Sequence, residues 1–432
     1  MSIDENAVFR KVSLRILPVL MLGFFFSYLN RVNVGFAKLQ MANELQFSDA
    51  VYGFGAGIFF VGYFLLEIPS NVVLHRVGAR RWISRIMITW GLLSCATIFV
   101  RTPMQFYVMR FLLGLAEAGF IPGAIYYMSQ WFPAARRGRA WGTFYIALAS
   151  SGVIGGLISG SILEFFSGLG GLRGWQWLIL CEGVPTMLLG VYIFLRMSED
   201  IRSVNWLSAD EKNWLSDTMA AEDRVKAAHG FGALLANGYV WALVAIYFLY
   251  NVGLYAISFW MPTLIQRMGA KDALAIGLLN AVPGLCAIVC MLAFGYSADR
   301  FRERKWHLIA AFSMAAVGFV LSVVWAHEPV LGIVALCVAN MGVLSIPSLF
   351  WAVPTSFLSG VTAAAGIAMI NSIGNLAGFV SPYMIGSLKE MTGRTDIALY
   401  VVAAGLVLGA LLVAAVMQTR KDRRGLAANV SR

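Results

Sequence analysis

The sequence predicts an all-α integral membrane protein of twelve transmembrane helices arranged as two pseudo-symmetric six-helix bundles. Three observations lead to this fold class. Of the 432 residues, 59% are hydrophobic and only 13% are charged, whereas a soluble domain carries about 25% charged residues. Apolar runs close to the roughly 20 residues that cross a hydrocarbon core recur along the whole chain. Basic residues gather at alternate breaks between these runs.

The apolar runs define the spans. Backbone polar groups find no water inside a bilayer, so runs of this length form helices, and they lack the alternating ten-residue pattern of a membrane barrel. To within a few residues at each end, the expected spans are residues 16–37, 51–74, 84–100, 104–128, 139–162, 176–196, 239–265, 274–297, 307–326, 330–352, 362–386 and 397–417.

The basic residues set the expected orientation. The net charge is +11, but its distribution follows the spans, which argues against a nucleic-acid partner. Because cytoplasmic loops carry an excess of Lys and Arg, both termini and the breaks after the second, fourth and eighth spans should be cytoplasmic. With such short outer loops, we expect a multi-pass protein of a bacterial plasma (inner) membrane, acting as a monomer. The basic groups are Arg10, Lys11, Arg15; Arg76, Arg80, Arg81, Arg85; Arg136, Arg137, Arg139; Arg300, Arg302, Arg304, Lys305; and Arg420, Lys421, Arg423, Arg424.

A polar stretch divides the chain. Residues 198–235 are rich in charge and form a predicted cytoplasmic linker between an N-terminal bundle (1–197) and a C-terminal bundle with its tail (236–432). Ser208 followed by acids predicts the start of a short surface helix. The loops at 71–81 and 295–305 place an Arg and a later basic pair at matching offsets, as a duplicated transporter would.

At this point a family resemblance is evident. The two loops resemble the paired loop motif of the major facilitator superfamily, and residues 110–123 (RFLLGLAEAGFIPG) resemble the fourth-helix motif of its anion:cation symporter family. Residues 174–183, which lead into the sixth span, match further. The resemblance covers nearly the whole chain and implies a proton-coupled symporter that imports a small organic carboxylate by alternating access. The motif wording is similar to permeases for phthalate and other aromatic acids, hydroxyphenylacetate and tartrate.

Ionisable groups inside spans are costly and usually functional. Arg31 lies well inside the first span, where a guanidinium needs an acid or an anionic ligand. Arg110 and Glu117 are seven residues apart, about two helical turns, and so share a face. We interpret Arg31 and Arg110 as substrate-binding residues and Glu117 as the proton carrier. The alternative is a permanent Arg110–Glu117 or Arg31–Glu117 pair that only holds helices together.

Asn30 is informative because it cannot titrate. Many members of the resembled family carry an aspartate at this position, which takes part in proton coupling. Two arginines therefore face a single evident acid, which favours a dianion, or a monoanion moved with a different proton count.

Other polar residues complete the predicted site. Tyr63 matches a substrate-contacting tyrosine of the family, with packing as the alternative. Glu67 is a candidate second coupling acid, with a gating or packing contact as the alternative, and Glu182 is interpreted as structural. The second half offers amides and an aromatic residue for the rest of the substrate, with helix packing as the alternative for each: Asn251, Tyr255, Asn371 and Asn375.

The cytoplasmic loops are expected to act as a gate. Arg76, Arg80 and Arg81 of the first half, with Asp299 and Arg300 of the second, would latch the outward-facing state. The cysteines fall in apolar runs, so we expect no metal site and no cofactor. Alternatives are an organic-anion uniporter or exchanger, a symporter of a sugar acid such as galactonate, a membrane-embedded enzyme and a nutrient sensor.

Overall fold

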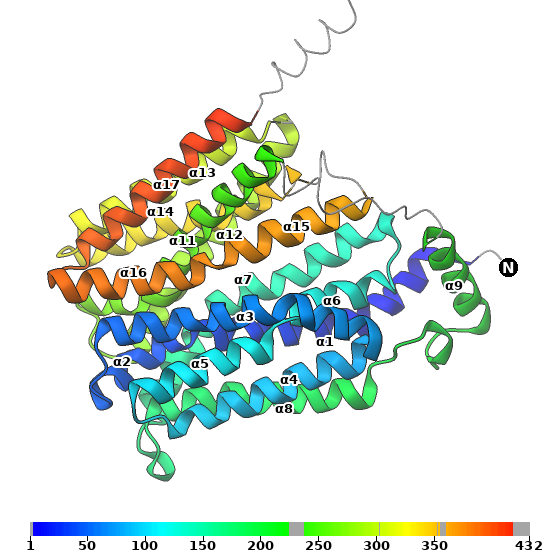
Figure 1. The fold of residues 1–432 in the computed structure, drawn as a ribbon, viewed down its shortest axis with the longest axis horizontal. Helices are drawn as coiled ribbons and strands as arrows, with labels where there is room; N and C mark the ends of the chain where they lie inside the picture. Colours follow the sequence, from blue (N-terminus) through cyan, green and yellow to red (C-terminus); the bar gives the residue numbers. More distant parts are fainter. Residues whose placement is uncertain (1–2, 224–236, 302, 352, 355–359, 418–432) are drawn as a thin grey trace, which may run out of the picture.

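The computed structural model describes residues 3–223, 237–301, 303–351, 353–354 and 360–417, and all regular structure in these ranges is helical. Figure 1 shows the long helices lying side by side, with α9 and the start of α1 at the same end of the bundle. This end is called the α9 end below, and the other is called the far end.

Each half of the chain supplies six crossings. The first half consists of α1 (Glu5–Val32) with α2 (Val34–Glu44), α3 (Asp49–Val77), α4 (Ala79–Ala96), α5 (Pro103–Glu117) with α6 (Phe120–Ser129), α7 (Ala134–Phe165) and α8 (Gly174–Arg196). The second half consists of α11 (Gly238–Arg267), α12 (Ala273–Phe301), α13 (Lys305–Val324), α14 (Pro329–Phe350), α15 (Gly360–Asn375) with α16 (Ala377–Thr392), and α17 (Asp396–Val416). Short 3-10 turns lie at Thr97–Phe99, Leu169–Gly171 and Ile201–Ser203.

Within the described ranges, eleven segments are long and apolar enough to cross a membrane. The twelfth crossing is made by α15 and α16, two helices of 16 residues separated by Leu376. The predicted all-helical fold of two six-helix halves is therefore confirmed. Three crossings are broken helices, which the apolar runs did not reveal.

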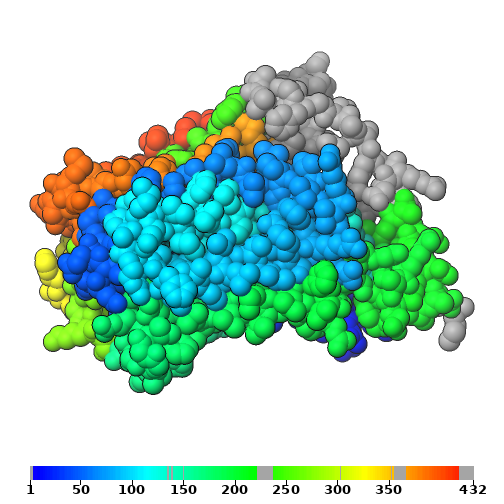
Figure 2. Space-filling view, turned by 60° about the horizontal axis from the view of Figure 1, so that its bottom comes forward, coloured from blue at the N-terminus to red at the C-terminus, as the bar shows by residue number. Residues whose placement is uncertain are grey.

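The halves meet along two seams. Helix α3 packs against α15 and α16, while α7 packs against α12, and α2 also contacts α11. The α3 seam is tight, because a Cβ atom added to Gly53 would lie 2.3 Å from the carbonyl oxygen of Pro382. In Figure 2 the helices of the first half, blue to green, form one continuous face with the orange C-terminal helices along its edge.

The predicted surface helix is α9 (Ala209–Asp223). Its start is a capping box, in which the Ser208 hydroxyl accepts from the Glu211 amide and the Glu211 carboxylate accepts from the Ser208 amide. Trp214 packs edge-on against Phe9, and Lys11 pairs with Glu211 at 2.8 Å. The Lys11 ammonium and the Ser208 amide lower the pKa of Glu211. Helix α9 is thus attached to the first half, and residues 224–235 of the predicted linker lie outside the described ranges.

Candidate functional site

A buried ion pair lies at the centre of the first half. The Nη2 atom of Arg31 is 2.5 Å from Oε1 of Glu117, and the hydroxyl of Ser27 donates to the same oxygen at 2.7 Å. Arg31 is 7% exposed and Glu117 is 1% exposed. Of the pairs considered from the sequence, the structure therefore forms the one between the first and fourth spans.

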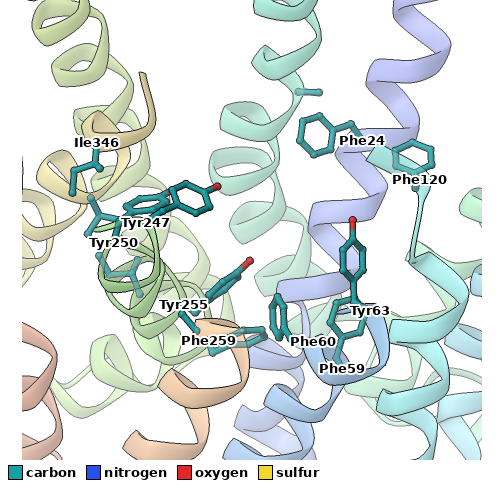
Figure 3. Close-up of a cluster of buried hydrophobic side chains, with 14 of the residues drawn as sticks. Phe24, Phe59, Phe60, Tyr63, Phe120, Tyr247, Tyr250, Tyr255, Phe259 and Ile346 are labelled. Carbon is teal, nitrogen blue, oxygen red and sulfur yellow. The ribbon is translucent and has the colours of Figure 1, made fainter. Parts of the chain in front are cut away.

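Aromatic rings of α3 surround the guanidinium of Arg31. Its Cζ atom lies 5.4 Å from the ring centre of Phe59, 5.7 Å from Phe60 and 5.2 Å from Tyr63. Figure 3 shows Tyr63 and Tyr255 on either side of Phe60, with both hydroxyl groups pointing to the same side. Ring faces attract the cation without neutralising it, so the charge of Arg31 is balanced by Glu117 and not by the rings.

Arg110 is also buried, at 3% exposure, but it has a different set of partners. Its guanidinium donates to the backbone oxygens of Gly55, Arg31 and Ala56 at 3.4 to 3.5 Å and lies 5.0 Å from the ring centre of Phe59. Among the described residues, no carboxylate pairs with it. Arg31, Arg110 and Glu117 together therefore carry one excess positive charge.

The crossing that carries Glu117 breaks immediately after it. Gly119 adopts a left-handed φ of 95°, and the open carbonyl of Ala118 accepts a hydrogen bond from the Ser70 hydroxyl at 2.7 Å. A Cβ atom on Gly119 would lie 2.1 Å from that hydroxyl oxygen, so only glycine fits. Broken helices persist at membrane depth where protein groups satisfy the freed backbone. The sequence predicted one continuous span over residues 104–128.

Asn30 faces the interior of the first half. Its Oδ1 atom accepts from Ser94 at 2.8 Å, and its amide donates to the Phe26 carbonyl at 3.1 Å and to Thr186 at 3.4 Å. A small cavity lies beside it. Its polar lining residues are Asn30, Asn33, Ser94, Thr97 and Arg110. Arg110 therefore lies between the Arg31 pair and this cavity.

The second half contributes hydroxyl–amide pairs. Tyr255 donates to Oδ1 of Asn375 at 3.0 Å, and Tyr247 donates to Oδ1 of Asn371 at 3.4 Å. The Tyr255 ring lies 4.5 Å from that of Phe60, so it meets the aromatic residues around Arg31. Asn251 instead donates to the Tyr247 carbonyl of its own helix. The sequence analysis missed Tyr247, although its four- and eight-residue spacing from Asn251 and Tyr255 places it on the same face.

Glu67 connects the halves. Its Oε2 atom accepts from the Ser372 hydroxyl of α15 at 2.7 Å, and the residue is 5% exposed. This carboxyl is close enough to the seam to respond to movement between α3 and α15.

The predicted gate residues lie at the α9 end and have partners in their own halves. Asp299 pairs with Arg304 at 2.9 Å, and Arg300 donates to Tyr296 at 3.3 Å. Arg80 lies 6.0 Å from the Phe194 ring, while Arg76 and Arg81 are exposed. In the part of the chain that the structure describes, no ion pair joins these two loops.

The far end is linked by a group of residues that we call the Asp49 cluster: Lys38, Asp49, Trp260 and Lys389. Asp49 pairs with Lys38 at 2.6 Å and also with Lys389 of the second half. The Lys38 ammonium lies 3.7 Å from the Trp260 ring centre. Beside the cluster, Tyr52 donates to the Phe259 carbonyl at 2.9 Å. No local sequence pattern predicts this cluster, because its members lie at four unrelated positions.

Comparison with known proteins extends these observations. The family model described as Major Facilitator Superfamily matches residues 20–382. The putative metabolite transport protein NicT of Pseudomonas putida is 45% identical over 95% of this chain and 94% of its own length. A putative tartrate transporter of Agrobacterium vitis is 46% identical over 99% of this chain and 98% of its own length.

Solved structures with low sequence identity share the fold. The xylose transporter XylE from E. coli, in a partially occluded inward open conformation, aligns with a TM-score of 0.75 at 14% identity, covering 95% of this chain and 98% of that one. An inward-facing, occupied bacterial homolog of the human lysosomal transporter Spinster aligns with a TM-score of 0.73 at 16% identity, covering 93% and 96%. These matches agree with the resemblance predicted from the loop and fourth-helix motifs: the chain belongs to the major facilitator superfamily and is a membrane transporter, not an enzyme.

Proposed function

We propose that this transporter is a proton-coupled symporter that imports a small organic carboxylate. The observation that carries the proposal is the charge at the centre: Arg31 and Arg110 are buried with Glu117 as the single carboxylate paired to either of them in the described chain. Burying an uncompensated charge is costly. A carboxylate ligand would complete the neutralisation, and the planar guanidinium suits it.

Proton coupling follows from competition for one guanidinium. In this structure Glu117 forms an ion pair with Arg31. Protonation of Glu117 removes its charge and leaves Arg31 free for the carboxylate of the substrate. Loss of the proton restores the Arg31–Glu117 pair and expels the anion. Glu67, which accepts from Ser372 across the seam, is our candidate for a second coupling acid.

The distribution of contacts between the halves supports an inward-facing state. The Asp49 cluster joins the halves at the far end, while the Arg76–Arg81 and Asp299–Arg300 loops are not joined by ion pairs among the described residues. We place the α9 end, with both termini, on the cytoplasmic side of a bacterial inner membrane because the basic loops gather there. Closure of the α9 end and opening of the Asp49 cluster would produce the outward-facing state.

The substrate class rests on the same charge count. One excess positive charge beside Glu117 becomes two when Glu117 is protonated, which favours a dianion. The relatives named as tartrate transporters are consistent with a hydroxy-diacid. The Tyr255 hydroxyl, paired with Asn375, and the Asn371 amide, paired with Tyr247, would bind the remainder of the substrate.

The test is uptake of radiolabelled tartrate by the purified protein in liposomes, with phthalate, 4-hydroxyphenylacetate and galactonate as competitors. We expect accumulation above equilibrium when the outside is acidic, with alkalinisation of the medium, and loss of accumulation when a protonophore is added. Accumulation that the protonophore leaves intact would refute proton coupling. Exchange of anions without proton movement would identify an exchanger instead.

A further inference from the structure

A second buried carboxyl lies outside the Arg31–Glu117 pair. Glu182 of α8 is 1% exposed. Its Oε2 atom accepts a hydrogen bond from the amide of Asn33, and its Oε1 atom has no hydrogen-bond partner within the described chain. One amide donor is a weak counterpart for a full negative charge in an apolar bundle.

The charged groups around Glu182 are engaged elsewhere. Helices α1, α2, α4 and α7 and the turn Thr97–Phe99 pack against α8. Among described residues, the titratable groups on these elements, on α8 itself and in the adjoining cavity include Arg31, paired with Glu117; Lys38, paired with Asp49; Arg110, bonded to backbone oxygens; Glu44, paired with Arg173; Glu164, which accepts from the Ala273 amide; and the thiols of Cys95 and Cys181. None of them forms an ion pair with Glu182, so the neutral, protonated carboxyl is the form that fits this environment.

A polar route leads from Glu182 to the central site. Asn33, its hydrogen-bond partner, lines the small cavity, as does Ile179 one turn earlier on α8. Arg110 lines the same cavity and donates to the backbone oxygen of Arg31. Several polar side chains converge on this space, which is the condition under which a buried cavity holds water. Water there would supply a proton to the Glu182 carboxylate and take it up again, with Asn33 between the carboxylate and the cavity.

Asn33 also occupies a mechanically important position. It lies between α1 and α2, two residues after Arg31, and the break in the first crossing is at this residue. The hydrogen bond from Asn33 therefore ties the junction beside Arg31 to α8. A change in the charge of Glu182 alters this bond, and with it the orientation of the helix end that carries Arg31.

We propose that Glu182, in addition to Glu117 and Glu67, is a proton-binding residue of the transport cycle, which exchanges its proton with the cavity and positions Arg31 through Asn33. This inference deepens the proposed symport and rests on it for its role in the cycle. It also supplies a further titratable group to a chain in which position 30 is an asparagine. The only chemical change is protonation: one proton binds the Glu182 carboxylate and is later released into the cavity.

The first measurement needs no substrate. Infrared difference spectra of the purified full-length protein are recorded between about pH 5 and about pH 9. We expect a protonated-carboxyl band that disappears as the pH rises, that is missing from Glu182→Gln and that persists in Glu44→Gln. Glu44 is a matched control because it also contacts α8, through Trp175, but is partly exposed and pairs with Arg173. Identical spectra for the wild type and Glu182→Gln overturn the proposal.

The second measurement is the pH profile of tartrate uptake. In Glu182→Gln we expect proton-driven uptake to fall at least about tenfold and to lose its pH dependence. Gln resembles the neutral acid, so a merely structural Glu182 would leave the profile unchanged, and that result overturns the proposal. Should Glu182→Gln fail to fold, Glu182→Asp replaces it, and the carboxyl band must then shift; an unshifted band counts against the proposal.

The two measurements separate the failure of this inference from the failure of the proposed function. Wild-type protein that moves tartrate without protons refutes the symport, whereas the infrared band still decides whether Glu182 binds and releases a proton.

Discussion

The two halves share a six-helix frame but differ in the chemistry they bring to the centre. The first half contributes Arg31, Arg110 and Glu117, all nearly inaccessible. The second half contributes the uncharged pairs of Tyr255 with Asn375 and Tyr247 with Asn371. In the proposed mechanism this difference becomes a division of labour, in which the first half binds the charge of the substrate and the proton and the second half selects the shape and polarity of the substrate.

The polar residues that both halves contribute to the centre lie at or near helix ends within the divided crossings. Arg31 precedes the α1–α2 break by two residues, Glu117 is the last residue of α5, and Asn375 is the last residue of α15. At Gly119 the chain turns and the Ala118 carbonyl is freed for Ser70, whereas Asn33 and Leu376 keep helical backbone angles, so the other two divisions are milder.

The largest expected effect comes from the proton carrier of the first half. Glu117→Gln should reduce accumulation of tartrate against its gradient by about 100-fold, because the side chain no longer exchanges a proton. Exchange at equal pH should persist. The check is uptake and exchange in the same liposomes, and a Glu117→Gln protein that still accumulates substrate would remove proton coupling from the first half.

The second-largest effect is expected when the planar guanidinium of Arg31 is replaced. Arg31→Lys keeps the charge but loses the planar pair of donors, so the affinity for tartrate should fall by about 10-fold to 100-fold. Binding is measured by calorimetry on the purified protein. Arg304→Lys, an exposed arginine at the α9 end, is the control. Full affinity in Arg31→Lys would mean that charge alone is recognised.

A substitution in the second half should alter the affinity for the substrate but not the coupling of transport to protons. Tyr255→Phe removes the hydrogen bond to Asn375, which is worth about 1 kcal/mol, and should change the KM for tartrate by about fivefold. The ratio of protons to tartrate should not change. A Tyr255→Phe protein with an altered ratio would show that the second half also takes part in coupling.

A substitution in the Asp49 cluster should give an effect of about the same size. Asp49→Asn removes the anion that joins Lys38 to Lys389 and should raise the population open at the far end by about fivefold, which corresponds to about 1 kcal/mol. Spin labels at Asn43 and Met391, both exposed, report the separation of the halves by pulsed electron resonance. An unchanged distance distribution would mean that glycine packing at the α3 seam closes this end without the ion pairs.

The smallest expected effect is on protein stability, through the ion pair that attaches α9 to α1. Lys11 lowers the pKa of Glu211 in the folded protein. The stability that this pair adds is therefore present above the pKa that Glu211 has in the unfolded chain, and it is lost as the pH falls through the lower pKa that Glu211 has in the folded protein. Lys11 is largely exposed, and the contribution should be about 0.5 kcal/mol. Thermal unfolding of Glu211→Gln and the wild type should therefore differ slightly at neutral pH and coincide in acid. A difference that persists in acid would have another cause.

Much of the frame could be predicted from the sequence, because hydrophobic length and basic loops are local properties. The buried arginines and Glu117 could be identified for the same reason: a charge within an apolar run is conspicuous. The sequence did not predict which arginine pairs with Glu117, since that depends on the rotation of three helices. It missed the Asp49 cluster and the role of Asn33, because those contacts join residues far apart in the chain. The roles assigned to the site residues remain predictions.

The junction after Glu117 has a consequence for engineering. The Ser70 hydroxyl donates to the Ala118 carbonyl and accepts from the indole of Trp82, so one small side chain fastens three helices. Neither Arg31 nor Glu117 contributes to this fastening. A redesign that replaces the charged pair to admit a neutral cargo can therefore keep the bent scaffold, provided that Ser70 and Gly119 stay in place.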